Sequence, residues 1–193
     1  EDPARLLRAI RFAAKLNFSI EKETEKPLYN MGALIHQIAP PRLFDEMLKL
    51  FLKGHAVQTF ELLLKYDLFN TLFPLANSSE KMIKLAMQNS DARIHQGKTL
   101  TPSFILAVIL WKPFLNALEH HALEDAVRIT IKSQTQLMTI PKRFTIAAEE
   151  IWRLQFRMKK RQRRSQHKIA QHPRFRAAYD FLALRAESGE IEA

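Results

Sequence analysis

Apolar residues recur along this chain at spacings of three and four positions rather than two. One such run is Leu43, Phe44, Met47, Leu48 and Phe51, which would lie along one face of an α-helix. Glycine occurs only four times, and we find no convincing strand pattern. We therefore expect an all-α fold, a multi-helix array of about eight to ten helices with a basic C-terminal helical region.

Residues that start and stop helices divide this pattern into elements. A capping residue precedes proline at three predicted helix starts: Asp2-Pro3, Thr101-Pro102 and His172-Pro173. The first two pairs have good cap chemistry. Gly54 is expected to close the helix that begins after Pro40-Pro41, where a left-handed residue is favoured. Breaks are expected near residues 17–19, 38–41, 54, 74–79, 97–102, 113, 140–144 and 171–173.

Composition places the chain among soluble globular proteins. It has 193 residues, of which 47% are apolar, and it contains no cysteine. Disulfides, thiolate metal ligands and cysteine nucleophiles are thereby excluded, and a reducing, cytoplasmic location is expected. The longest apolar run, Phe104 to Trp111, is far shorter than the roughly 20 residues of a membrane span, so no span is expected. Because the chain begins on a helix cap rather than on Met, we expect a fragment of a longer protein.

The net charge of +10 is concentrated near the C-terminus. Residues 1–141 carry +3, residues 142–185 carry +10, and residues 186–193 carry −3. Within the basic segment, RMKKRQRR at 157–164 has six basic residues in eight. Such a run would attract a polyanion, although a solvated helix face would have the same composition.

Local enzyme motifs mostly fail. Gly97-Lys98-Thr99 imitates the end of a P-loop, but the glycine that the motif needs five residues earlier is Ala92. His120-His121 with Glu124 has helical metal-ligand spacing but lacks a further partner. Adjacent carboxylates point about 100° apart on a helix and do not converge on one metal. We therefore assign no catalytic residue and no metal ligand to this chain.

The opening stretch EDPARLLRAIRF raises a different question. A cap at Asp2 and an apolar helix face explain much of it, but not Arg5, Arg8 and Arg11, which lie near the positive end of the helix dipole. Asp2 and Arg5 are three residues apart, so an acceptor and a donor stand side by side. The two could form a salt bridge, or they could present both groups to the edge of a nucleobase.

The stretch EDPARLLRAIRFAAKL resembles the EDxxR motif of nucleotidyltransferases that extend RNA 3′ ends without a template, namely bacterial poly(A) polymerases and the related CCA-adding enzymes. Four further stretches are similar to the same family: IAPPRLFDEMLKLFLKG (38–54), DLFNTLFP (67–74), IPKRFTIAAEEIWRLQFRM (140–158) and HPRFRAAYDFLALRA (172–186). In this family a head domain with a Gly-Ser loop and paired aspartates precedes the motif. That head is absent from this sequence, which accounts for the missing catalytic centre.

The resemblance implies a base-reading role for Asp2 and Arg5, which would pair with the Watson–Crick edge of the incoming nucleotide. Adenine and cytosine each offer an amino donor beside a ring-nitrogen acceptor, whereas guanine and uracil present the reverse pattern. Selection of ATP over CTP would then depend on pocket shape, with Arg8 as a further nucleotide-binding residue. Glu1 would orient its neighbours, and Arg42 matches a family arginine in a supporting helix.

The basic segment resembles the arginine-rich C-terminal region of bacterial poly(A) polymerases in particular. The residues expected to bind RNA are Arg42, Arg157, Lys159, Lys160, Arg161, Arg163, Arg164, Lys168, Arg174 and Arg176. Phe156, Phe175 and Tyr179 could stack bases, but Trp152 and Phe156 are four residues apart and fit the core better.

Taken with the family, these features imply three parts: a neck and RNA-binding helical domain (1–75), a helical body (76–141) and an arginine-rich RNA-binding region (142–193). The expected partners are single-stranded RNA 3′ ends, ATP as substrate and the missing head in the same chain, which would hold Mg²⁺. The whole enzyme would add AMP to RNA in mRNA processing and decay, and this fragment would be inactive alone. A CCA-adding enzyme and a non-catalytic RNA-binding module remain as alternatives.

Overall fold

The computed structural model describes residues 2–76, 80–159 and 163–191, and only the backbone at residues 163–166. These residues form twelve α-helices and one 3-10 helix, with no strand among them, which confirms the all-α fold. In chain order the elements are α1 (Ala4–Leu16), α2 (Lys22–Asn30), η1 (Gly32–Gln37), α3 (Pro40–Phe51), α4 (Ala56–Lys65), α5 (Leu68–Leu72), α6 (Glu80–His95), α7 (Pro102–Ile109), α8 (Trp111–Leu118), α9 (Leu123–Leu137), α10 (Lys142–Lys159), α11 (Arg163–Ala170) and α12 (Phe175–Ser188).

Most of the expected breaks lie between helices, but the one at Pro113 is wrong. The chain breaks instead at Leu110, and Pro113 is the third residue of α8. Proline is tolerated there because N–H groups in the first turn have no helical partner. Short elements such as η1 and α5 account for the larger number of helices.

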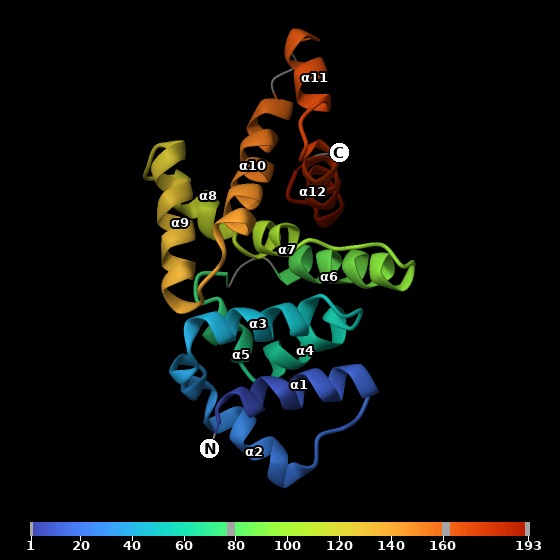
Figure 1. Ribbon diagram of the computed structural model, residues 1–193, viewed down its shortest axis with the longest axis vertical. Helices are drawn as coiled ribbons and strands as arrows, with labels where there is room; N and C mark the ends of the chain where they lie inside the picture. Colours follow the sequence, from blue (N-terminus) through green and yellow to red (C-terminus); the bar gives the residue numbers. More distant parts are fainter. Residues whose placement is uncertain (1, 77–79, 160–162, 192–193) are drawn as a thin grey trace.

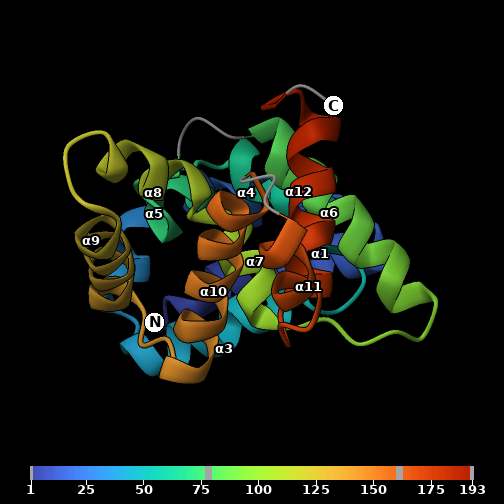
Figure 2. The same cartoon turned by 90° about the horizontal axis from the view of Figure 1, so that it is seen from above.

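The helices are stacked along the long axis of the molecule (Figure 1). Helices α1 to α5 form the lower part, α6 to α8 cross the middle, and α9 to α12 form the upper part, with α11 at the tip. Seen from above in Figure 2, α9 lies on the opposite side of α10 from α6 and α12.

The apolar run of α7 lies at the centre of the fold. Residues 105–110 are at most 1% exposed, as expected for a helix that is apolar on every side. Helix α10 packs against α7 through Trp152, whose Nε1 donates to the carbonyl of Ala107 at 3.0 Å. The Trp152 ring also stacks on Phe114 at 4.7 Å, so the interpretation of Trp152 as a core residue is confirmed.

One continuous hydrophobic core runs from Ala4 to Leu184 and includes helices from all three expected parts. A smaller cluster of Leu154, Ile169 and Ala178 attaches α11 to α10 and α12. The upper helices are therefore held on the body by apolar packing, and the basic segment is carried on a folded support.

The predicted caps differ in how they are made. Thr101 has extended backbone before Pro102, but its side chain makes no capping hydrogen bond. At the third start the helix begins at Phe175, later than predicted, and His172 Nδ1 accepts the N–H of Arg174 at 3.1 Å.

Gly54 lies in the turn between α3 and α4 rather than directly at the end of α3. It has the expected positive φ of 81°, a conformation that glycine adopts without strain. A Cβ atom there would lie 3.1 Å from Nε2 of His95, so the turn packs closely against the end of α6.

Within the described parts of the chain, no helix has both the length and the apolar character needed to cross a membrane.

Candidate nucleic-acid interface

Asp2 caps the first helix, as its position before proline predicted. Its Oδ1 accepts the backbone N–H of Ala4 at 3.1 Å, while the helix itself begins at Ala4 with Pro3 just before it. An acid at this end also complements the helix dipole. Glu1, the first residue of the motif, lies outside the described residues.

The other oxygen of Asp2 binds a residue forty positions away. Oδ2 lies 2.5 Å from Nη2 of Arg42, in the first turn of α3. The hydrogen bond from Arg42 and the N–H of Ala4 lower the pKa of Asp2, with a smaller contribution from the charge of Arg8, while burial opposes them. Asp2 is therefore an ionised acceptor at neutral pH, held in place from two sides.

This arrangement bears on the two interpretations of the Asp2–Arg5 pair. Asp2 forms an ion pair with Arg42, a residue that neither interpretation included. The side chains of Asp2 and Arg42 are 35% and 45% exposed, and Arg5 and Arg8 are exposed on α1. A carboxylate has about four lone-pair sites, so Asp2 retains acceptor capacity toward a ligand.

Arg11 differs from the other two arginines of α1. It is partly buried, and its Nε has no hydrogen-bond partner within the described structure. Its guanidinium lies over the ring of Phe12 at 4.7 Å. Arg11 is therefore packed on Phe12 and is less accessible to solvent than Arg5 and Arg8.

We define the cationic tip by the end of α10, with Arg157 and Lys159, and by α11, with Lys168; α11 lies at the upper end of the molecule (Figure 1). Arg157, Lys159 and Lys168 are exposed there. The predicted RNA-binding residues Lys160 and Arg161 lie outside the described residues, as do the side chains of Arg163 and Arg164.

Two other arginines predicted to bind RNA are paired with carboxylates. Arg174 Nε lies 3.2 Å from Oε2 of Glu150, and Arg176 Nε lies 3.0 Å from Oδ1 of Asp180. Only the Arg176–Asp180 pair could be expected from sequence spacing, because its members are four residues apart on one helix. Glu150 belongs to a different helix from Arg174. The charge that both arginines offer to a polyanion is correspondingly reduced.

The aromatic residues of this region divide between core and surface. Phe156 is partly buried and lies 6.1 Å from Phe114. Phe175 packs on the small cluster beneath α11. Tyr179 is 54% exposed and is therefore the residue of this set best placed to stack a base.

The entrance of α1 and the cationic tip lie at opposite ends of the long axis (Figure 1). The segment before α10 lies between them, because the N–H of Thr139 donates to the carbonyl of Pro40 at 3.1 Å. Pro40 begins α3, the helix of Arg42. The 18 residues of α10 span about 27 Å and lead from this segment toward the cationic tip.

The P-loop-like tripeptide and the His-His-Glu cluster lie among local polar contacts. Gly97-Lys98-Thr99 lies in the loop after α6, with Lys98 bonded to the side chain of Gln96. Glu124 directs both carboxylate oxygens to Arg153. In the described part of the chain, no three His, Asp or Glu side chains gather as metal ligands.

Two family models match this chain. The one described as "Polymerase A arginine-rich C-terminus" matches residues 116–193. The one described as "Probable RNA and SrmB- binding site of polymerase A" matches residues 17–79. Both matches overlap stretches on which the resemblance was based.

Similar curated proteins include poly(A) polymerases, matched over nearly the whole chain, and CCA-adding enzymes, matched over part of it. The chain is 39% identical to Poly(A) polymerase I of Escherichia coli, over 97% of this chain and 44% of that protein. It is 35% identical to Poly(A) polymerase I of Haemophilus influenzae, over 97% of this chain and 46% of that protein. It is 37% identical to the CCA-adding enzyme of Anoxybacillus flavithermus, over 45% of this chain and 22% of that protein. The chain thus spans less than half the length of these relatives.

Proposed function

We propose that this chain is the base-recognition and RNA-binding part of a template-independent poly(A) polymerase. The chain is homologous to bacterial poly(A) polymerases over nearly its whole length and to CCA-adding enzymes over part of it. The observation that carries the proposal is the ionised, half-exposed Asp2, fixed by Ala4 and Arg42 beside the exposed Arg5 and Arg8.

In this proposal Asp2 accepts a hydrogen bond from the amino group of adenine, and Arg5 donates to the neighbouring ring nitrogen. Guanine and uracil would set a carbonyl against the carboxylate and an N–H against the guanidinium, and both are rejected. Arg42 acts as a positioning residue, because its ion pair fixes the Asp2 carboxylate. Arg8, one turn further along α1, is a further nucleotide-binding residue in this proposal.

The complete polymerase would catalyse attack of the RNA 3′-hydroxyl on the α-phosphate of ATP, with pyrophosphate as the leaving group. Mg²⁺ would neutralise phosphate charge in that reaction. The described residues offer no ligand set for this ion, and in this proposal a head domain holds it, so that this chain alone transfers no AMP.

A CCA-adding enzyme is the second candidate, because such an enzyme matches 45% of this chain. The arginine-rich region favours the polymerase, since diffuse phosphate attraction suits single-stranded 3′ ends of any sequence. The products distinguish the two: a polymerase extends an unstructured RNA with many A residues, whereas a CCA-adding enzyme stops after CCA on tRNA. A non-catalytic RNA-binding module would give neither product.

The test uses the full-length protein and steady-state kinetics with ATP and GTP. Asp2→Ala and Arg5→Ala should each lower kcat/KM for ATP by about five-fold to a hundredfold, the range of a bidentate base contact, and should reduce discrimination against GTP. Arg42→Ala should lower kcat/KM in the same direction, with partial rescue by Arg42→Lys, because it releases Asp2.

Lys98→Ala, in the loop after α6, is the matched control and should leave kcat/KM unchanged. If Asp2→Ala and Arg5→Ala both kept the ATP kinetics and the ATP preference of the parent, the base-recognition role would be wrong.

A further inference from the structure

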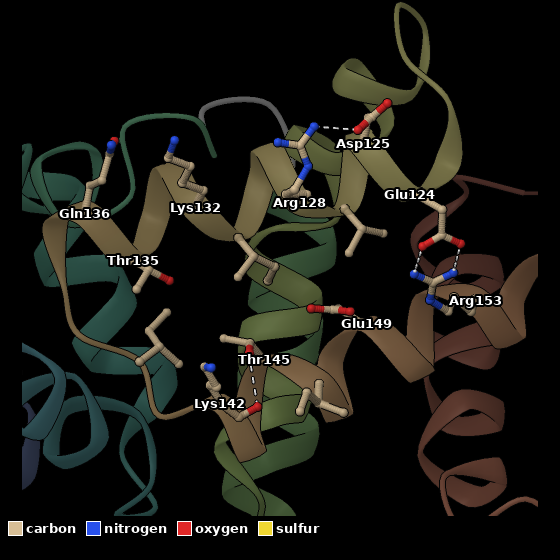
Figure 3. Close-up of a pocket in the computed structure, with 14 residues that line it drawn as sticks. Glu124, Asp125, Arg128, Lys132, Thr135, Gln136, Lys142, Thr145, Glu149 and Arg153 are labelled. Atoms are coloured by element: carbon tan, nitrogen blue, oxygen red, sulfur yellow. Dashed lines mark hydrogen bonds and ion pairs between the residues drawn. The ribbon is translucent and has the colours of Figure 1, made fainter.

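A groove of about 690 Å³ lies between α9 and α10 (Figure 3). Its volume falls within the range of ligand sites in proteins, roughly 300–1,000 Å³. Both helices belong to the upper part of the molecule, and α10 also packs on α7 and α12. The groove was not evident from the sequence, because its two walls come from separate helices.

The walls of the groove are largely apolar. They include Val127 and Ile131 from α9, Ile140 from the connection, and Ile146 from α10. Ile146 is 52% exposed, although its neighbours Thr145 and Ala147 are buried. An apolar side chain at the mouth of a polar-rimmed groove suits a flat apolar face such as that of a base.

One end of the groove is electrically neutral. Arg153 donates to both oxygens of Glu124 at 2.5 Å, so this pair links α10 to α9. Arg128 lies 2.5 Å from Asp125 in the same region. These four charges neutralise one another in pairs. Little electrostatic attraction remains for a charged ligand at this end.

The other end of the groove is basic. Lys142 begins α10 and points into the groove, and Lys132 stands on the rim formed by α9 (Figure 3). Neither lysine forms an ion pair within the described structure. Arg143 is exposed beside Lys142. The charges at this end can therefore attract an anionic group such as a phosphate.

Polar groups between the two ends lack partners. The carboxylate of Glu149 lies in the groove (Figure 3) and makes no hydrogen bond or ion pair with the described residues. Burial raises its pKa, and the nearby charges of Glu124 and Glu150 raise it further, against the opposing charge of Arg153. The Thr135 hydroxyl is also without a hydrogen bond in the described structure. A half-buried carboxylate in apolar surroundings is stabilised by a hydrogen-bond donor.

The basic end of the groove lies near the start of α3. Thr139 bonds to Pro40 at 3.1 Å, and the rings of Phe144 and Phe44 lie 5.8 Å apart. These contacts fasten the start of α10 to the start of α3, which carries Arg42. At its other end α10 leads into the cationic tip.

We infer that the α9–α10 groove holds one unpaired nucleotide of the RNA strand, with its base against Ile131 and Ile146, its amino group at Glu149 and a flanking phosphate at Lys142. This inference rests on the proposed function, and it adds the path by which RNA crosses from the entrance of α1 to the cationic tip. Adenine and cytosine carry the required amino group beside a ring nitrogen, and uracil does not.

The charge distribution favours RNA over a protein helix as the occupant. The unpaired lysines lie at the end of the groove near the start of α3, and the exposed Arg157 and Lys159 lie at the other end of α10, so cations that can meet phosphates flank the groove. The apolar wall comprises three isoleucines and one valine. This wall is shorter than the extended apolar stripe that an amphipathic helix buries in a groove.

The test measures binding of labelled oligo(A) and oligo(U), about 16 nucleotides long, to the 193-residue chain by fluorescence anisotropy. Ile146→Ala should weaken oligo(A) binding by about fivefold or more, the lower end of the range for one base contact. Lys142→Ala should weaken oligo(A) and oligo(U) alike, because it removes a phosphate contact. Glu149→Gln should weaken oligo(A) more than oligo(U), so the preference for A falls.

Two substitutions outside the groove serve as matched controls. Leu75→Ala removes an apolar side chain that is 49% exposed, and Lys98→Ala removes an exposed lysine. Both should bind as the parent chain does. Thermal melts check that each variant folds. Folding is expected, because Ile146 and Lys142 are exposed and their replacement disturbs little packing.

The outcomes separate this inference from the proposed function. If the parent chain binds RNA but all three groove variants bind as tightly as the controls, the groove is not on the RNA path, and it would then suit a protein partner. If the parent chain does not bind RNA, the proposed function fails as well. Photocrosslinking of oligo(A) that carries 8-azidoadenosine, which keeps the amino group, gives an independent readout with the parent chain: crosslinks within residues 123–153 support the inference, and crosslinks confined to other segments overturn it.

Discussion

Asp91 fixes the start of α4 from a helix that comes later in the chain. Its Oδ1 accepts the N–H of Ala56 at 2.8 Å, and its Oδ2 accepts the N–H of Val57 at 3.0 Å. His55, which precedes α4, provides no side-chain cap. A buried carboxylate thus replaces the local capping residue that a helix start usually has, and no local pattern in the sequence reveals this role.

Replacement of Asp91 should therefore destabilise the fold. We expect Asp91→Ala to lower the free energy of unfolding by about 2–3 kcal/mol, because a buried N–H group and a partly buried one lose a carboxylate acceptor. Asp91→Asn should cost less, since its amide oxygen still accepts one bond. Urea titration followed by circular dichroism measures the difference. Asp45→Ala, exposed on α3, is the control, and equal stability of the Asp91→Ala and Asp45→Ala variants would contradict the capping role.

At the scale of single elements, α2 is attached by one buried apolar residue and by a cluster of contacts around Glu25. Leu28 is its only buried residue. Glu25 accepts from Lys65 Nζ at 2.6 Å and from the Tyr66 hydroxyl at 2.7 Å, and Tyr29 meets Tyr66 edge to face at 4.9 Å. The hydrogen bonds from Lys65 and then Tyr66 lower the pKa of Glu25, and the pKa of Lys65 is raised in return.

We expect Glu25→Gln to speed amide hydrogen exchange in residues 22–30 at neutral pH, because α2 loses its charged contact with α4. The pKa of Glu25 is lowered on folding, so its contribution is complete above the ordinary carboxyl value of about 4.3. It is lost as pH falls through the lowered value. The difference in Tm between parent and variant should accordingly disappear in acid.

Glu23→Gln is the control on the same helix, because Glu23 pairs only with the exposed Lys26 nearby. Hydrogen exchange with mass spectrometry should show little change in this variant. Equal exchange rates in the two variants would show that Glu25 does not hold α2.

At the scale of the whole molecule, the charges that face a polyanion are fewer than the sequence suggests. Arg157, Lys159 and Lys168 are exposed and form no ion pair with the described residues, whereas Arg174 and Arg176 are paired with acids. Because RNA affinity depends on salt through the cations that meet phosphates, the two groups should contribute unequally.

We expect the logarithm of RNA affinity to fall with the logarithm of salt concentration with a slope of about −3.5 if about five cations meet phosphates. A fourfold rise in salt would then weaken binding roughly a hundredfold. Replacing Arg157, Lys159 and Lys168 by Ala should reduce the slope by about 2, measured by anisotropy across a salt series. The double replacement of Arg174 and Arg176 should reduce it by less per charge, and an equal reduction per charge would contradict this distinction.

The sequence alone determined the features that depend on neighbouring residues. Spacings of three and four positions predicted helices, proline marked where several of them start, and the charge count located the basic segment. Asp2 was predicted as a cap from its place before Pro3, and its partner, Ala4, is only two residues away. These features follow from local backbone geometry, which a short stretch of sequence specifies.

Only the tertiary structure decided which distant side chains meet. The pairing of Asp2 with Arg42, of Glu150 with Arg174 and of Glu124 with Arg153 joins residues on different helices. The groove beside Glu149 likewise depends on how α9 diverges from α10. Such contacts depend on the packing of helices around a shared core, and a helical period shows which face of a helix is buried but not which helix will cover it.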